Sequence, residues 1–170
     1  GVQRLAEGLG AGALPAVTVL SLGGTYVGDA GASAFAAALG HGALPRLNRL
    51  ILSSTAIGDA GLMALAPALR RRPALKLLSL ARNPLGDKGL AALVAPPLPA
   101  GAPPPAGVLT KLKELYLDHT QITDAGCSAL ASALDRGALP ALKVFCLSDS
   151  PASIAAKAGV RAARDRLTCW

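Results

Sequence analysis

The chain has 170 residues, which is enough for one sizeable core or for a short array of repeats. Hydrophobic residues make up 52% of it and aromatic residues only 3%, which disfavours an enzyme pocket lined by aromatic side chains. The formal net charge of +7 keeps acidic surfaces and nucleic acid open as partners. No apolar run approaches the ~18 residues that a membrane-spanning helix needs, so we expect no transmembrane segment.

One type of segment recurs along the chain. It reads YVGDAGASAFAAAL at Tyr26–Leu39, and it returns at Ala56–Leu69, at Gln121–Leu134 and, in a degenerate form, at Pro84–Pro97. Equivalent apolar residues lie 30, 28, 37 and 30 positions apart: Val17, Leu47, Leu75, Leu112 and Leu142. A period of this size is typical of a solenoid, in which neighbouring units bury each other's cores.

The first 13 residues align with residues 31–43, which lie in the middle of the next unit. The chain therefore opens inside a unit. We expect residues 1–170 to form a single repeat domain, which is the C-terminal part of a longer array.

Each complete unit is predicted to begin with a short strand, because apolar residues alternate there. The alternating pairs lie on one face of that strand: Leu20 and Leu22, Leu50 and Leu52, Leu78 and Leu80, Leu115 and Leu117, Phe145 and Leu147. A polar column follows at the turn: Thr25, Thr55, Asn83, Thr120 and Ser150. These side chains are predicted to satisfy backbone groups that neither strand nor helix uses.

A helix is predicted in the second half of each unit, where apolar residues recur every four positions, as in Phe35 and Leu39. An aspartate stands at the junction between strand and helix in four units: Asp29, Asp59, Asp87 and Asp124. There a carboxylate can accept hydrogen bonds from free N–H groups and favours the positive end of the helix dipole.

The pattern Leu-x-x-Leu-x-Leu-x-x-Asn/Thr-x-Leu/Ile-x-Asp-x-Gly, followed by a helix, resembles the leucine-rich repeat of the ribonuclease-inhibitor type. It is also similar to the repeats of Ran GTPase-activating proteins and NOD-like receptors. The resemblance implies an α/β leucine-rich-repeat solenoid shaped as a horseshoe arc, with parallel strands on the concave face and helices on the convex face. It also implies a non-catalytic module that binds a protein partner through the concave face.

Three segments depart from the repeat. Pro67 lies inside a predicted helix and is expected to kink or shorten it. The Pro-rich stretch 95–107 is expected to be a loop insertion, although its prolines also fit a polyproline II ligand for SH3- or WW-type domains. Residues 151–170 are expected to form a C-terminal capping unit, with Ser153 as the N-cap of its helix.

Candidate binding residues are the strand side chains that lie between the buried leucines. Most are small or neutral, but charged and aromatic residues gather around the fourth strand. The predicted partner-binding residues are Arg49, Arg82, Glu114, Tyr116, Asp118, His119 and Asp149. Tyrosine is common at binding hot spots. The alternative interpretation is a solvated strand face without a partner.

Charge separates along the units, with basic residues before the strands and acidic residues after them. Nucleic acid is an unlikely partner, because only Tyr116 is available on the predicted concave face to stack on a base. There is no HExxH, no phosphate-binding glycine loop and no paired-cysteine motif, so we expect no enzyme activity, no metal and no cofactor.

The cysteines bear on the cellular compartment. Cys127, Cys146 and Cys169 are odd in number and lack CxxC spacing, which favours reduced thiols and an intracellular protein. We expect either a monomer or a subunit of a larger complex. The alternative function is a structural subunit of an assembly, which contacts it through the convex helices or the Pro-rich loop.

Overall fold

The computed structural model describes residues 4, 7–8, 14–94, 109–163 and 167–168. Its strands are β1 (Val19–Ser21), β2 (Arg49–Ile51), β3 (Leu77–Ser79), β4 (Glu114–Tyr116) and β5 (Val144–Cys146). Its helices are α2 (Gly28–Gly40), α3 (Asp59–Arg70), α4 (Asp87–Val94), α5 (Asp124–Asp135) and α6 (Ile154–Ala162). None of the helices in these residues is both long and apolar enough to cross a membrane.

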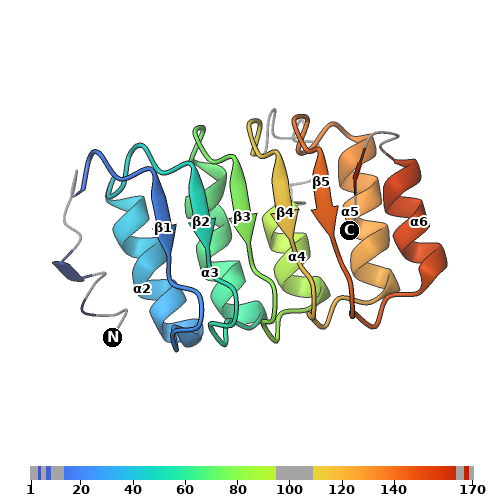
Figure 1. Cartoon of the computed structure of the whole chain (residues 1–170), viewed down its shortest axis with the longest axis horizontal. Coiled ribbons are helices and arrows are strands. Elements are labelled where there is room, and N and C mark those ends of the chain that lie inside the picture. The colour runs from blue at the N-terminus through green and yellow to red at the C-terminus, as the bar shows by residue number, and fades with distance from the viewer. Residues whose placement is uncertain (1–3, 5–6, 9–13, 95–108, 164–166, 169–170) are drawn as a thin grey trace, which may run out of the picture.

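Strands and helices form two layers (Figure 1). The five strands lie in one parallel sheet in the order of the chain, and each is followed by a helix packed behind it. The register joins equivalent positions of successive units, so that Leu20, Leu50, Leu78, Leu115 and Phe145 form one row. This is the α/β solenoid that the sequence pattern predicts.

The core lies between the sheet and the helices. Leu50, Leu78 and Leu115 on the strands are completely buried, as are Leu65 and Leu130 on the helices. Each fully buried leucine side chain contributes roughly 1.5–3 kcal/mol by leaving water. Because these rows run through every unit, most of the burial depends on contacts between units rather than within one.

The polar column at the turn does what the sequence predicts. The hydroxyl groups of Thr55 and Thr120 each donate a hydrogen bond of 2.7 Å to the carbonyl three residues earlier. Asn83 bonds to the preceding unit, because its Oδ1 accepts hydrogen bonds from the backbone N–H groups of Thr55 (3.0 Å) and Ile57 (3.1 Å). Asn83 is only 2% exposed and therefore joins two units inside the core.

The junction aspartates bind the start of the helix of the following unit, and two of them, Asp29 and Asp59, cap that helix directly. Asp59 is the first residue of α3, and its Oδ1 accepts hydrogen bonds from the N–H groups of Gly86 (2.7 Å) and Gly89 (2.8 Å) at the start of α4. Asp29 binds Gly58 and Gly61 in the same way, at 2.7 and 2.9 Å. The cap expected from the sequence is therefore present, and it links neighbouring units.

This link explains the glycine of the Asp-x-Gly pattern. A Cβ atom placed on Gly89 would lie 2.8 Å from Oδ1 of Asp59. On Gly126 the corresponding distance, to Oδ1 of Asp87, would be 2.3 Å. A side chain at this position would therefore expel the carboxylate that caps the helix.

The last two helices use different capping chemistry, in which a hydroxyl side chain is the N-cap. In α5 this is Thr123, and Asp87 binds its N–H (2.8 Å) and its hydroxyl (2.6 Å). Ser153 is the N-cap of α6, as predicted, and the Ser153 hydroxyl accepts from the N–H of Ala156 (3.1 Å). Asp124 binds the N–H and the hydroxyl of Ser153, at 2.6 and 2.9 Å. Because the serine reaches the N–H of Ala156, the carboxylate does not have to, and alanine replaces glycine there.

Beyond α6, Thr168 lies beside the outer edge of β5. Its carbonyl accepts from the N–H of Phe145 (3.1 Å), and its own N–H donates to the carbonyl of Lys143 (2.9 Å). These bonds occupy backbone groups on an edge that would otherwise be open to pairing. The capping role of residues 151–170 stays a prediction, and residues 164–166 and 169–170 lie outside the described residues.

Pro67 is predicted to kink or shorten its helix, and the predicted shortening is wrong. Helix α3 runs through Pro67 to Arg70 and has 12 residues, as many as α5. Pro67 is exposed, so its ring does not disturb the packed face of the helix. The predicted Pro-rich insertion at 95–107 lies outside the described residues.

Candidate protein-binding site

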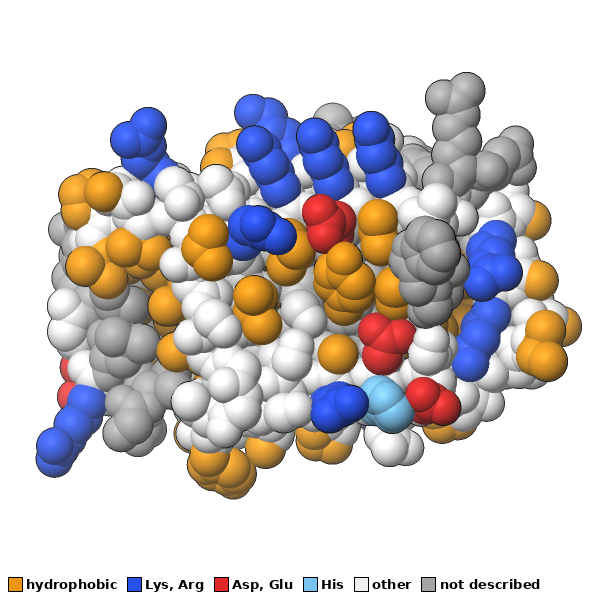
Figure 2. Space-filling model, in the orientation of Figure 1, with side chains coloured by type: hydrophobic (Ala, Val, Ile, Leu, Met, Phe, Trp, Pro, Cys, Tyr) orange, Lys and Arg blue, Asp and Glu red, His pale blue; other side chains and the backbone are white. Residues whose placement is uncertain are grey.

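The exposed side of the sheet, which we call the strand face, carries the predicted site residues. The first row across it runs Val19, Arg49, Leu77, Glu114 and Val144. The next runs Ser21, Ile51, Ser79, Tyr116 and Cys146. Figure 2 looks onto this face and shows mostly white and orange surface, with few charged side chains over the middle strands.

Leu77 makes an apolar centre between two charged residues. It pairs with Arg49 on one side and Glu114 on the other, and it is only 6% exposed although it lies outside the main core. Arg49 is exposed and Glu114 is half-buried. The arrangement offers a partner a small apolar contact flanked by one positive and one negative side chain.

Tyr116 and Glu114 are hydrogen-bonded to each other on the strand face. The Tyr116 hydroxyl donates a 2.9 Å hydrogen bond to Oε2 of Glu114 from the same strand. Partial burial raises the pKa of Tyr116, and the hydrogen bond to the Glu114 carboxylate raises it further. The phenol therefore stays neutral and is held in place, which lowers the entropy that it loses when a partner packs on it.

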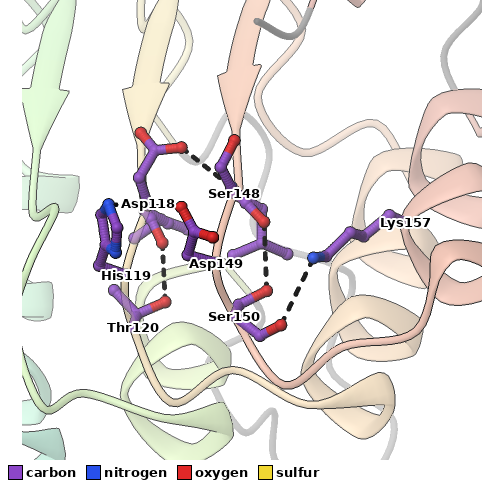
Figure 3. A network of polar contacts seen from close by, with 9 residues as sticks. Asp118, His119, Thr120, Ser148, Asp149, Ser150 and Lys157 are labelled. Atoms are coloured by element: carbon purple, nitrogen blue, oxygen red, sulfur yellow. Dashed lines mark hydrogen bonds and ion pairs between the residues drawn. The ribbon is translucent and has the colours of Figure 1, made fainter.

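Asp118 is held by the neighbouring strand. Its Oδ1 accepts a 2.9 Å hydrogen bond from the backbone N–H of Ser148, beyond the end of β5 (Figure 3). Part of its acceptor capacity is therefore used inside the protein. A partner has the remaining lone pairs of a half-buried carboxylate to bind.

Arg82, His119 and Asp149 occupy equivalent positions of three successive units, one position further along the chain than Asp118 and its equivalents. Nε2 of His119 lies 3.4 Å from Oδ2 of Asp149, and both side chains are well exposed. All three residues have left-handed backbone, with φ between 51° and 56°. The same column contains Gly24 (φ 74°) and Ser54 (φ 56°), so this conformation belongs to the turn of every unit and is no sign of a functional site.

The structure thus divides the predicted residues into two groups. Glu114 and Tyr116 bond to each other near the start of the strands, and Arg49 lies two strands away in the same row. Arg82, Asp118, His119 and Asp149 gather where the strands end. Among residues 14–94 and 109–163, no group of His, Cys, Asp or Glu could hold a metal ion.

Sequence reasoning placed these residues on one face but missed how they pair. The hydrogen bond between Tyr116 and Glu114 could have been predicted, because residues two apart on a strand point the same way. The hydrogen bond between Asp118 and Ser148 could not, because it depends on how the turn after β5 is folded.

Comparison with known proteins settles the family. A sequence model described as a leucine-rich repeat matches residues 14–36, 45–66, 73–94 and 108–131, which together make up more than half of the chain. The chain belongs to the leucine-rich repeat family. Domains of this family generally mediate protein–protein interaction.

The chain is also similar to a protein of the ribonuclease-inhibitor type. The repeat domain is 37% identical over 84 residues to the ribonuclease inhibitor of Sus scrofa. That alignment covers 49% of this chain and 16% of the inhibitor, so the chain spans only a small part of its relative's length.

One solved structure supports the fold. The actin-binding site 2 of leiomodin-1 superposes with a TM-score of 0.65 at 14% identity, over 97% of this repeat domain and 86% of that chain. A leucine-rich repeat protein of Leptospira interrogans gives a TM-score of 0.45 at 20% identity, over 75% of this chain and 26% of that one.

Proposed function

We propose that this domain is a non-catalytic, intracellular recognition module, which binds a protein partner through the strand face. The observation that supports this most is the group formed by Leu77, Glu114 and Tyr116, with Arg49 beside it. It combines a buried apolar contact, a rigid phenol and charges of both signs, which is the composition of a binding hot spot.

Similarity to the ribonuclease inhibitor supports the same proposal. That relative is named for inhibiting an enzyme, and inhibition of an enzyme by a protein requires a protein–protein contact. The chemistry of the strand face defines the kind of partner that this chain is expected to bind.

The test compares substitutions on the two faces of the domain. Tyr116→Ala removes the proposed anchor and is expected to weaken capture of the partner from native extract at least tenfold, since truncating a hot spot costs about 2 kcal/mol or more and about 1.4 kcal/mol is a factor of ten. Met63→Ala on α3 is the matched control, because Met63 is 50% exposed on the opposite layer. Circular dichroism checks that both variants stay folded.

Cross-linking separates this proposal from the alternative of a structural subunit. Binding through the strand face predicts partner cross-links at Lys113, next to Glu114, and their loss in Tyr116→Ala. Cross-links that instead fall on Lys88 or Lys157, and survive Tyr116→Ala, would contradict it. They would show that the domain is held through its helices.

Asp118 needs a milder substitution, because its carboxylate also binds the N–H of Ser148. Asp118→Asn keeps an acceptor oxygen for that bond and removes the charge. Loss of partner binding in this variant, with unchanged thermal stability, assigns Asp118 to the interface. Unchanged binding limits Asp118 to a structural role.

A further inference from the structure

A row of lysines crosses the edge of the sheet where the strands begin. Lys76, Lys113 and Lys143 each stand one residue before a strand, at the same position of three successive units. Their backbones are joined, because the N–H of Lys113 donates to the carbonyl of Lys76 (2.8 Å) and the N–H of Lys143 to that of Lys113 (2.9 Å). All three are exposed, and Figure 2 shows blue side chains side by side along this edge.

These lysines differ from the arginines of the same edge, which serve the fold. The Arg72 guanidinium donates to the carbonyls of Leu39 and Leu44, and that of Arg70 donates to the carbonyl of Ala92. Partial burial lowers the pKa of both arginines. No such bond is made by the ammonium groups of Lys76, Lys113 and Lys143 within residues 14–94 and 109–163.

Stacking these like charges works against folding. Adjacent strands lie about 4.8 Å apart, and two cations at that distance repel by roughly 1 kcal/mol even in water. Within the described residues the ion pair is that of His119 and Asp149, which lies at the opposite edge of the sheet. An acidic partner would relieve the repulsion.

We infer that Lys76, Lys113 and Lys143 form a docking edge for an acidic α-helix of the protein partner. The inference rests on the proposed function, since the row borders the strand face at Glu114. Three strands place the outer lysine backbones about 10 Å apart. Helix residues i and i+7 are separated by about 10.5 Å, and the residue between them at i+3 or i+4 lies on the same face.

Two other occupants fit less well. An extended acidic segment places three side chains of one face over about 13 Å, which is longer than the row. Single-stranded nucleic acid is bound by basic grooves that also supply aromatic side chains for stacking. In the part of the chain that the structure describes, Tyr116 is the one aromatic residue on the strand face, and its hydroxyl is bonded to Glu114.

The test uses a synthetic helical peptide with glutamates at i, i+4 and i+7. Its isomer, with the same glutamates spread around the helix, is the control for charge alone. Binding is measured by fluorescence anisotropy at about 10 mM and at about 150 mM salt, because added salt screens exposed charges. The patterned peptide is expected to bind several-fold tighter than its isomer and to weaken in the higher salt.

Lys76→Gln/Lys113→Gln/Lys143→Gln is expected to weaken the peptide roughly tenfold, since each exposed ion pair contributes only a few-fold. Lys88→Gln/Lys157→Gln/Arg161→Gln removes the same charge from helices α4 and α6, outside the row, and should have little effect. Equal losses in the two triple variants, or equal binding of the two peptides, would overturn the inference. So would an oligouridine that binds more tightly than the peptide and is lost with the same lysines.

Tyr116→Ala separates this inference from the proposed function. The substitution should leave peptide binding unchanged, because Tyr116 is not part of the row. If Tyr116→Ala fails to weaken the natural partner while the peptide still prefers the lysines, the strand-face proposal fails and the docking edge stands. If the lysine variant binds the peptide as well as the unchanged protein does, the docking edge fails alone.

Discussion

Replacing Asp59 tests whether the link between units stabilises the array. Asp59→Ala removes the acceptor of two backbone N–H groups at the start of α4, those of Gly86 and Gly89. Loss of a helix cap costs about 0.5–2 kcal/mol, and hydrogen bonds to charged groups are worth more than neutral ones. We expect the free energy of unfolding, measured by urea denaturation at pH 7, to fall by about 2 kcal/mol.

The glycine that faces Asp59 makes the test specific. Gly89→Ala should by itself cost about 2 kcal/mol, because its Cβ would lie 2.8 Å from Oδ1 of Asp59. In the Asp59→Ala background that clash is gone, and alanine is favoured in a helix by roughly 1 kcal/mol over glycine. The Cβ would still lie 3.2 Å from Cδ2 of Leu62 and 3.3 Å from Cα of residue 59, and these tight contacts offset the helix preference of alanine. The double variant should then be about as stable as Asp59→Ala.

A double-mutant cycle measures this dependence, and the expected coupling is over 1 kcal/mol. Asp135→Ala is the control, because Asp135 is an exposed aspartate at the end of α5, where removing a negative charge favours the helix. Losses that add within about 0.5 kcal/mol would refute the reasoning, since the two sites would then be independent.

Further predictions concern the turn, the last unit and the buried thiol. Asn83→Ala should lower the free energy of unfolding by about 4 kcal/mol in the same urea assay, because it leaves several buried backbone groups unpaired. Thr120→Ala loses one hydrogen bond and should cost only about 1 kcal/mol. Hydrogen bonds from Ser153 lower the pKa of Asp124, so the stabilising effect of this carboxylate should be complete at neutral pH. The effect should disappear as the pH falls through the ordinary pKa of an aspartate and then through the lowered pKa of Asp124. Urea midpoints of the unchanged protein and of Asp124→Ala should therefore converge in acid, and a constant difference would contradict the linkage. Burial raises the pKa of Cys127, which is 1% exposed, so iodoacetamide should label it only upon unfolding, and labelling as fast as that of a free peptide thiol would disprove its burial.

The fold could be predicted because its signals are periodic. Alternating leucines and leucines at spacing four fix which residues face the core, and the structure places them there. The partner of each junction aspartate could not be predicted in this way. Periodicity shows where a helix begins, but whether Asp59 caps its own helix or the next depends on the packing of neighbouring units.

For the site, too, the sequence predicts the positions of the residues but not all of their contacts. The row positions of Arg49, Glu114 and Tyr116 follow from register alone. The burial of Leu77 does not, because register fixes the row of a residue but not how closely its neighbours pack around it. Nor could the sequence distinguish the arginines bound to helix ends from the lysines left in solvent, since both occur in the same basic stretch of the repeat.

The Asp-x-Gly contact crosses the border between units. Each middle unit therefore provides a carboxylate that binds the unit after it, and glycines that receive the carboxylate of the unit before it. A copy of such a unit, inserted beside the original, would therefore find a matching surface on both sides. Arrays built this way can lengthen or shorten by whole units without any new contact having to arise. The Ser153–Ala156 end departs from this rule, because Ile154 stands where the next carboxylate would be.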